Sequence, residues 1–274
     1  MPTENAQRVY TPRLGVAAPG MSWVPAPNYL LRRAAILDWL RDAPTGRVLE
    51  MGCGPGPLLY DLSLRGFEAT GVETSTRSLE ISPKLLGDTQ AVTVQSTPPA
   101  IGERYDYLFA FEVLEHIEDD VGALRSWLNY LKPGGRVLVS IPAHRRRWNV
   151  TDVCAGHFRR YDREDVARLF SDAGLQPTRI GSYGWPLSRL LEILRNVAKK
   201  RELARDGIDP TTLRIGDAEL SAASGSDRSL LARLYPLYAG PVGVSFLSLA
   251  AFVQKAFYDS SLGVSFLVDA RKES

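Results

Sequence analysis

A glycine-rich stretch near the start of the chain, Val48-Leu-Glu-Met-Gly-Cys-Gly-Pro-Gly-Pro57, constrains the fold more than any other feature. A short apolar run leads into it, and a helical pattern of apolar residues follows at once. Gly52, Gly54 and Gly56 allow a sharp turn and a close approach of the backbone to a ligand. This order of strand, glycine turn and helix opens nucleotide-binding α/β domains.

The spacing of these glycines distinguishes two kinds of cofactor site. The chain has G-x-G-x-G with Pro55 and Pro57, whereas dinucleotide-binding folds have G-x-G-x-x-G. Glu50, two residues before the first glycine, suits an ammonium group better than a pyrophosphate. With this acid, the stretch resembles the E/D-x-G-x-G-x-G motif of the class I S-adenosylmethionine (SAM) methyltransferases. The resemblance implies that the turn holds the methionine part of SAM, through Glu50, Gly52, Cys53, Gly54 and Gly56.

Later motifs extend the resemblance along the chain. Glu73 ends the second predicted strand, about 20 residues after the turn, where the family places an acid on both ribose hydroxyls. Ser96 follows the third strand, where the family often has an acid for the adenine amino group, so adenine recognition falls to its hydroxyl or to the backbone. Residues 131–142, Leu-Lys-Pro-Gly-Gly-Arg-Val-Leu-Val-Ser-Ile-Pro, are similar to the family's signature after strand four. Phe111 and Glu112, at the end of that strand, complete the predicted cofactor site.

Apolar runs and turn residues predict seven strands with helices between them. The strands are expected at 47–50, 67–73, 91–95, 105–111, 136–142, 176–183 and 263–269, and the helices at 58–65, at 163–173 and from an N-cap at Asn28 to before Pro44. The resemblance, which spans 46–143, implies an α/β fold. Its form is a doubly wound, mostly parallel seven-stranded sheet, Rossmann-like, with a helical insertion between strands six and seven.

The chain divides into four parts: an N-terminal arm at 1–27 without helical or strand periodicity, the SAM-binding core at 28–186, a helical lid or insertion at 187–261, and the last strand with the tail at 262–274. Trp23 is expected to pin the arm. Helical patterns at 187–203 and 229–258 flank a polar segment, 205–228, that is expected to be mobile. The insertion is interpreted as a lid over the ends of the strands, which shapes a pocket for an acceptor with an apolar part. Self-packing helices or a dimer interface are equal alternatives.

One long uncharged run in the insertion could be buried in the protein or could contact a membrane. No charged residue occurs between Arg233 and Lys255, a length that counts as a membrane-span candidate. Because Pro236, Gly240 and Pro241 interrupt it, we expect buried or substrate-facing helices, with a peripheral membrane contact as the alternative.

Composition narrows the class of protein. The 274 residues, of which 45% are apolar, suffice for one α/β domain and an appendage. A net charge of +2 argues against a nucleic-acid partner. The two cysteines, Cys53 and Cys154, exclude a disulfide framework, and the first residues lack a signal-peptide pattern, so we expect a cytoplasmic protein.

Methylation of a hydroxyl needs alignment of the acceptor and removal of its proton. The chain has three histidines, His116, His144 and His157, and all follow the fourth or the fifth predicted strand. All three are candidate catalytic bases. In the segments after the fifth strand, His144 and His157 are better candidates for a base than the neighbouring arginines, because a neutral imidazole is available near neutral pH.

The Glu112-x-x-Glu115-His116 pattern suggests a metal site. At a helix start these three side chains share one face, and carboxylate and imidazole ligands bind Mg²⁺, Mn²⁺ or similar ions. The pattern resembles that of metal-assisted O-methyltransferases, both the ubiquinone type and the small-RNA 2′-O type. In the latter a further histidine follows strand five, as His157 does here. Metal-free relatives also carry Leu-Glu-His at this position, with the histidine as a packing residue and the glutamate at a helix start.

A second cluster is basic and aromatic. Trp148, Arg159, Arg160 and Tyr161 are assigned to the acceptor, as a clamp for a phosphate or carboxylate and a stacking surface for a ring. The alternative is a solvated basic loop in which Arg160 or Tyr161 only braces the fold.

These patterns predict a SAM-dependent methyltransferase that methylates an oxygen of a sugar, phenolic or lipid-linked acceptor. The alternatives are metal-assisted RNA 2′-O-methylation, N- or C-methylation, and a SAM-binding or membrane-associated protein without catalysis. The oligomeric state does not follow from the sequence.

Overall fold

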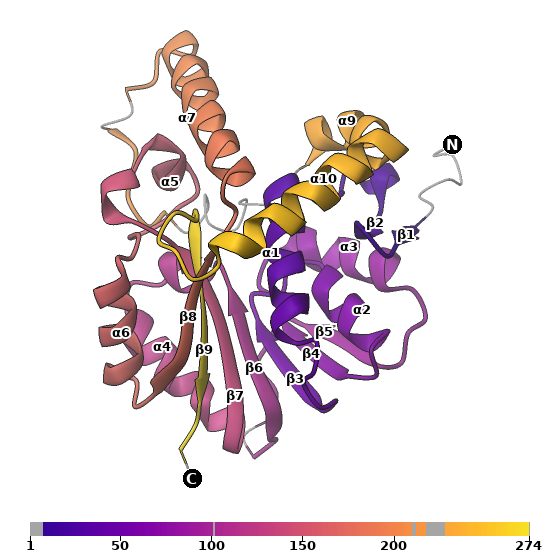
Figure 1. Ribbon diagram of the computed structural model, residues 1–274, viewed down its shortest axis with the longest axis vertical. Coiled ribbons are helices and arrows are strands. Elements are labelled where there is room, and N and C mark those ends of the chain that lie inside the picture. Colours follow the sequence, from indigo (N-terminus) through magenta and orange to yellow (C-terminus); the bar gives the residue numbers. More distant parts are fainter. Residues whose placement is uncertain (1–7, 101, 210–211, 218–227, 274) are drawn as a thin grey trace.

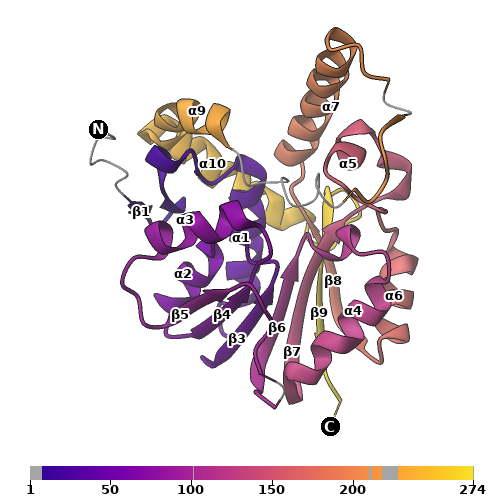
Figure 2. The ribbon, with the colours of Figure 1, turned by 180° about the vertical axis from the view of Figure 1, so that it is seen from behind.

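A twisted seven-stranded sheet forms the centre of the computed structural model, which describes residues 8–100, 102–209, 212–217 and 228–273 (Figures 1 and 2). In spatial order the strands are β5 (Val92–Gln95), β4 (Glu68–Val72), β3 (Arg47–Met51), β6 (Tyr105–Phe111), β7 (Leu131–Pro142), β9 (Ser265–Arg271) and β8 (Gln176–Tyr183). All are parallel except β9, which runs antiparallel to both neighbours. This arrangement confirms the predicted doubly wound sheet.

Helices cover both faces of the sheet, so its central strands are buried on both sides. The first five helices are α1 (Pro27–Trp39), α2 (Pro57–Ser63), α3 (Thr76–Leu86), α4 (Asp120–Trp127) and α5 (Val150–Cys154), and α6 (Arg163–Asp172) follows. Apolar side chains of α1 and α2 form one core with β3, β4 and β6, and those of α4 and α6 form a second core on the other face. Burial on both faces explains why β6 reads as a continuous apolar run instead of an alternating one.

Two local predictions near the ends of elements are wrong. Asn28 is not an N-cap, because the helix begins at Pro27 with Ala26 as its cap, and proline favours the first helical position. The strand predicted at 136–142 begins earlier than expected, because Leu131 already pairs with Tyr105 and starts β7.

The N-terminal arm contains strands that the sequence did not predict. Residues Val9–Thr11 (β1) and Gly15–Ala17 (β2) pair as an antiparallel hairpin. The expectation for Trp23 is confirmed: the indole is buried against Ile81 and Leu85 of α3. The arm thus gains its order by packing on the domain.

The insertion lies at the carboxyl end of the sheet, and its described residues include the long helices α7 (Leu187–Arg205), α9 (Ser229–Ala239) and α10 (Pro241–Val253) (Figure 1). The helical pattern predicted at 229–258 is therefore two helices that meet at Gly240, followed by a short 3-10 turn, Gln254–Phe257. Their inner sides pack on the arm and on α1. Half of the segment 205–228, for which mobility was predicted, lies outside the described residues, at 210–211 and 218–227.

The expectation that these helices are buried is wrong for their outer sides. Val242, Phe246 and Phe252 are 84%, 57% and 71% exposed. Within the described ranges, no single helix is both long and apolar enough to cross a membrane. The helix Ser229–Ala239 and the stretch Pro241–Phe257 meet that measure only when taken together, across a bend of 95°.

Candidate active site

A cavity of about 1120 Å³ opens at the carboxyl ends of β3 and β6, beneath the insertion. The strand order reverses between these two strands, and open α/β sheets bind ligands at such a reversal. The cavity lining comes from the glycine turn, the ends of β4 and β6, the loop after α5, and helices α1, α7 and α9. The sheet therefore brings the predicted cofactor motif and the predicted metal motif to one place.

The glycine turn leaves a shallow cradle beside the cavity. The backbone N–H groups of Gly52 and Cys53 donate to the Val72 carbonyl, which fixes the turn against β4. A Cβ at Gly52 would lie 2.5 Å from the Val113 side chain, so this position requires glycine. Gly54, with φ +57°, has open space where a side chain would stand. Its backbone is thus exposed to a ligand, as the motif predicts.

Glu73 presents two fixed acceptor oxygens at the cavity. Its Oε2 accepts a hydrogen bond of 2.7 Å from Gly54 N, and its Oε1 accepts one of 2.7 Å from Ser75 N. Each oxygen keeps a lone pair for another donor. Two adjacent hydroxyl groups would fit this carboxylate, as expected for a ribose.

Glu50 is a buried acid with an unused oxygen. The side chain is buried at the end of β3, and its Oε2 has no hydrogen-bond partner among the described residues. Burial raises the pKa of Glu50 to about 8, Arg32 opposes this shift and Glu73 adds to it. A bound ammonium group would supply the missing partner and favour the ionised carboxylate. The orphaned oxygen, the open cradle at Gly54 and the paired oxygens of Glu73 together fit SAM.

Arg32 is a cavity residue that the sequence analysis missed. It projects from α1 into the lining, and its closest electrostatic neighbours include Glu112 and Glu50. No carboxylate lies in ion-pair distance of it within the described part of the chain, whereas the next residue, Arg33, forms a bidentate ion pair with Asp61. A guanidinium without a carboxylate partner from the described residues suits a carboxylate ligand. The only sequence signal was a second arginine on a helix whose opposite face is apolar.

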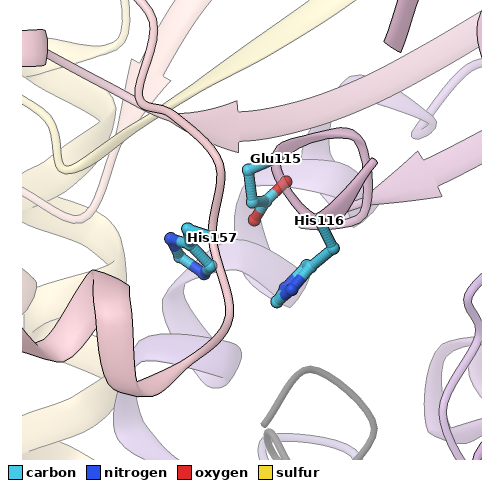
Figure 3. Close-up of side chains that lie close together, drawn as sticks. All are labelled: Glu115, His116 and His157. Carbon is cyan, nitrogen blue, oxygen red and sulfur yellow. The ribbon is translucent and has the colours of Figure 1, made fainter. Parts of the chain in front are cut away.

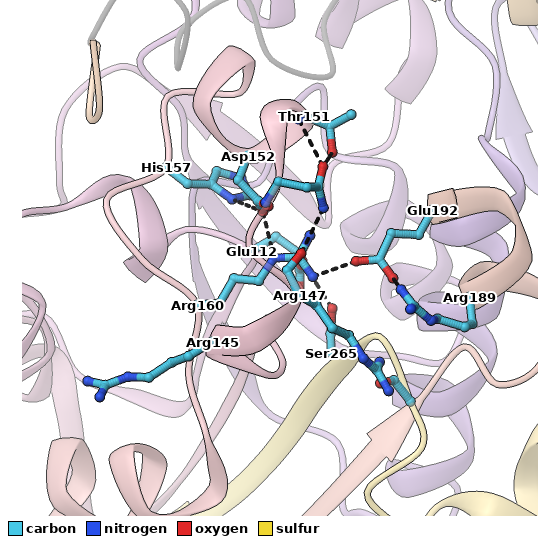
Figure 4. A network of polar contacts seen from close by, with 12 residues as sticks. Glu112, Arg145, Arg147, Thr151, Asp152, His157, Arg160, Arg189, Glu192 and Ser265 are labelled. Carbon is cyan, nitrogen blue, oxygen red and sulfur yellow. Dashed lines mark hydrogen bonds and ion pairs between the residues drawn. The ribbon is translucent and has the colours of Figure 1, made fainter. Parts of the chain in front are cut away.

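Glu112 does not join the predicted metal set. The segment after β6 forms only a 3-10 turn, Leu114–His116, and Glu112 precedes it with φ +58°, so the expected shared helix face is absent. Its Oε1 accepts hydrogen bonds of 2.9 Å from both Ser140 Oγ and Tyr183 Oη (Figure 4 labels Glu112). Glu112 lines the cavity but its carboxylate is held by the ends of β7 and β8.

Glu115, His116 and His157 form a compact cluster in the cavity wall (Figure 3). One ligand atom of each lies within 4.8 Å of the others, and the imidazole rings of the two histidines stand perpendicular, 4.7 Å apart. The Glu115 side chain is fully buried, and neither carboxylate oxygen has a hydrogen-bond partner in the described ranges. Burial, and secondarily the charge of Glu112, raises the pKa of Glu115 well above its usual range. A cation bound between these groups would remove the cost of this buried, unpaired acid.

A network of ion pairs orients His157 from behind (Figure 4). Asp152 Oδ1 lies 3.1 Å from His157 Nδ1 and accepts a hydrogen bond of 2.7 Å from Arg160 Nε. Arg160 in turn pairs with Glu192 of α7. Burial alone would raise the pKa of Asp152, but the hydrogen bonds from His157 and Arg160 hold it below its usual range. A proton on Nδ1, shared with an ionised Asp152, leaves His157 Nε2 as an acceptor or ligand.

His144 is a correction to the predicted set of bases. It does not line the cavity, and its buried ring packs on Phe266. Burial, followed by the charge of Arg147, lowers the pKa of His144. Of the three histidines, only His116 and His157 reach the cavity.

Three of the four residues of the predicted acceptor clamp lie outside the cavity lining. Trp148, Arg159 and Tyr161 do not line the cavity. Arg159 forms an ion pair with Asp120, and the Tyr161 hydroxyl donates to the same carboxylate at 2.7 Å, so the alternative of a bracing role holds for Tyr161. Arg160 does line the cavity, although its guanidinium is engaged by two acids.

Three further predicted cofactor residues lie at the cavity, whereas Gly56 is buried and does not belong to its lining. Cys53, Ser96 and Phe111 belong to its lining, with Cys53 and Phe111 buried and Ser96 exposed. Their contacts with a cofactor stay a prediction.

Comparisons with known proteins give the family. A model described as "Methyltransferase domain" matches residues 28–180, more than half of the chain. A ubiquinone biosynthesis O-methyltransferase of Aeromonas salmonicida (strain A449) is 32% identical over 115 residues, which cover 38% of this chain and 48% of that protein. One of Vibrio cholerae serotype O1 (strain M66-2) is 34% identical over 119 residues, which cover 41% and 46%. The chain thus spans about half the length of the curated relatives it matches.

Solved structures share the fold over most of the chain. A Bacillus halodurans C-125 protein, provisionally assigned as a methyltransferase, has a TM-score of 0.55 at 15% identity, covering 88% of this chain and 99% of that one. The cyclase SpnF has a TM-score of 0.52 at 16% identity, covering 92% and 83%. At these identities the likeness concerns the fold alone. From the matched domain, the strand order and the glycine turn, we conclude that the chain belongs to the class I SAM-dependent methyltransferase family.

Proposed function

We propose that the protein is a SAM-dependent O-methyltransferase whose acceptor oxygen is positioned by a divalent cation on Glu115, His116 and His157. The observation that carries this proposal is the buried, unpaired Glu115 carboxylate, with two imidazoles beside it, in the same cavity as the SAM motif. The names of the curated relatives, ubiquinone biosynthesis O-methyltransferases, support oxygen as the methylated atom.

The cofactor's two charged groups would face two opposite charges of the chain. Glu50 would hold the ammonium group, and Arg32 would hold the carboxylate. Glu73 would accept hydrogen bonds from the ribose hydroxyls. SAM supplies an electrophilic methyl group, so the protein's task is to align an acceptor oxygen with it and to exclude competing water.

The ligand set favours certain metals. Two imidazole nitrogens and one carboxylate suit Mn²⁺, Co²⁺, Fe²⁺ or Zn²⁺ better than Mg²⁺, which prefers oxygen ligands. Glu115, His116 and His157 would hold such a cation, which would supply Lewis-acid chemistry for the deprotonation of a hydroxyl. Asp152 orients His157 for this task through Nδ1.

We place a small or medium acceptor with an apolar part in the remaining space. Ile117, Trp127, Phe158 and Leu231 contribute apolar side chains to the cavity lining. The modest net charge, +2, speaks against RNA as the acceptor. Phenolic and lipid-linked acceptors fit these walls better than a bare sugar.

The test is methyl transfer from SAM to a panel of phenolic, lipid-linked, sugar and RNA acceptors, each with EDTA and then with Mn²⁺, Co²⁺, Zn²⁺ or Mg²⁺ added back. We expect EDTA to abolish turnover and an imidazole-binding metal to restore it. Glu115→Gln should lose both metal binding and turnover while SAM still binds in calorimetry. His144→Asn is the matched control, because His144 lies outside the cavity at φ +68°, a conformation that asparagine tolerates.

Two outcomes would contradict the proposal. Turnover that is indifferent to EDTA would remove the metal and leave His157, backed by Asp152, as the base. Absence of SAM binding to the wild-type protein would remove the methyltransferase function altogether.

A further inference from the structure

Helices α9 and α10 are apolar on both their inner and their outer sides. On the inner side, Tyr235 and Leu247 are buried in a cluster with Leu14, Val24 and Leu30. The outer side carries seven large apolar side chains that are each more than two-fifths exposed: Leu230, Leu234, Leu237, Val242, Phe246, Leu249 and Phe252. We call these seven residues the outer apolar face. A helix that is apolar all round normally lies in a protein core or in lipid, and soluble monomers rarely leave such a face in water.

The helical segment that carries this face contains charges of one sign. Between Asp227 and Asp259 the chain contains no acidic residue, and its only charged residues there are Arg228, Arg233 and Lys255. Arg233 and Lys255 are exposed at the two ends of the uncharged stretch, and the Lys255 ammonium group also forms an ion pair of 2.7 Å with Asp38 of α1. An apolar surface bordered by basic residues complements an anionic phospholipid membrane.

The dimensions and the packing of the two helices fit a position in the plane of a membrane surface. Their 11 and 13 residues correspond to about 16 and 20 Å at 1.5 Å per residue, against a hydrocarbon core of about 30 Å. The 95° bend between α9 and the stretch that contains α10 prevents them from acting as one rod, and their inner sides are already packed on the arm and α1. Figure 1 shows them at the upper end of the molecule, away from the C-terminus.

We propose that the outer apolar face docks the protein on an anionic phospholipid membrane, with α9 and α10 lying in the plane of the interface. This inference goes beyond the proposed reaction and does not depend on it. The cavity lies directly behind the face, because Leu231 on the inner side of α9 belongs to its lining. An acceptor with a lipid tail would therefore have a short path from the membrane to the cavity.

The test is flotation of the full-length protein with vesicles of phosphatidylcholine alone and of phosphatidylcholine with phosphatidylglycerol. We expect the wild-type protein to float with the anionic vesicles, and to float less well at high salt. Replacing Phe246→Glu together with Leu249→Glu should lower the bound fraction at least about tenfold, because two apolar contacts become charges. Leu64→Glu is the matched control: this leucine at the end of α2 is 55% exposed and lies outside the face.

The outcomes distinguish membrane docking from a dimer interface and from loss of folding in the variant. Calorimetric SAM binding by the double variant shows that its core is folded. No flotation of the wild-type protein with either vesicle, or equal flotation of the double variant, overturns the proposal. If the wild-type protein does not float, is a dimer in sedimentation equilibrium, and becomes a monomer in the double variant, the face is assigned to a second copy of the chain instead. Flotation without methyl transfer to any acceptor would overturn the proposed function and leave the docking intact.

Discussion

Replacing Glu50→Gln should stabilise the SAM-free protein and weaken its binding of SAM at the same time. In the folded protein burial raises the pKa of Glu50 to about 8, against an ordinary value of 4.5. The stability that the protonated carboxyl contributes is therefore fully present below pH 4.5 and is lost as the pH rises through about 8. Glutamine has nearly the same shape and carries no charge, so the variant escapes this loss.

The size of the effect follows from the pKa difference. A difference of about 3.5 pH units at 1.36 kcal/mol per unit gives an upper value of about 5 kcal/mol above pH 8. Since water enters such sites, we expect a gain of about 2–5 kcal/mol near pH 9 and almost none near pH 4.5. For SAM, loss of one charge-assisted contact should weaken binding about tenfold or more.

Urea unfolding of both proteins without SAM, near pH 5 and near pH 9, measures the first effect, and calorimetry measures the second. Glu73→Gln is the control, because its carboxylate already accepts two backbone hydrogen bonds, so the amide should give no gain in stability. A stability difference between wild type and Glu50→Gln that does not grow with pH would refute the reasoning about the buried acid. Unchanged SAM affinity would refute its role in binding.

Four further substitutions test other parts of the site. Arg32→Gln should weaken SAM binding about 10- to 100-fold in calorimetry. It should leave the unfolding free energy unchanged within about 1 kcal/mol, because the guanidinium forms no ion pair with a described residue. An unaltered affinity would show that Arg32 does not hold the SAM carboxylate. Gly52→Ala should lower the unfolding free energy by at least about 2 kcal/mol, because its Cβ would meet Val113 at 2.5 Å. Gly54→Ala should lower it by about 1 kcal/mol and should mainly weaken SAM binding. Equal losses of stability in thermal melts of the two variants would contradict this difference. Asp152→Asn should reduce Mn²⁺ affinity about 10- to 100-fold in titration calorimetry, because His157 loses the carboxylate that orients it. If the variant binds Mn²⁺ as tightly as the wild-type protein, Asp152 only braces the loop.

The local sequence determined the cofactor half of the site. A strand followed by glycines at alternate positions can form only a tight turn, and an acid at the end of the next parallel strand must lie beside that turn, because neighbouring strands are in register. The positions of Gly52, Gly54, Glu50 and Glu73 at one cavity agree with this spacing. The order and direction of the strands, including the antiparallel β9, were predicted only through the resemblance to a known family.

Loops and single turns have no regular side-chain period, so only the tertiary structure decided which of their side chains face the cavity. Glu112 and Glu115 are three residues apart, yet a single 3-10 turn sends one carboxylate to β7 and β8 and the other to the histidines. His144 and His157 both follow β7, and the packing of one ring on Phe266 separates their roles. The apolar pattern of α9 and α10 likewise predicted helices, but it did not predict that their outer sides are exposed. The helical period shows which residues share a face and not what lies against that face.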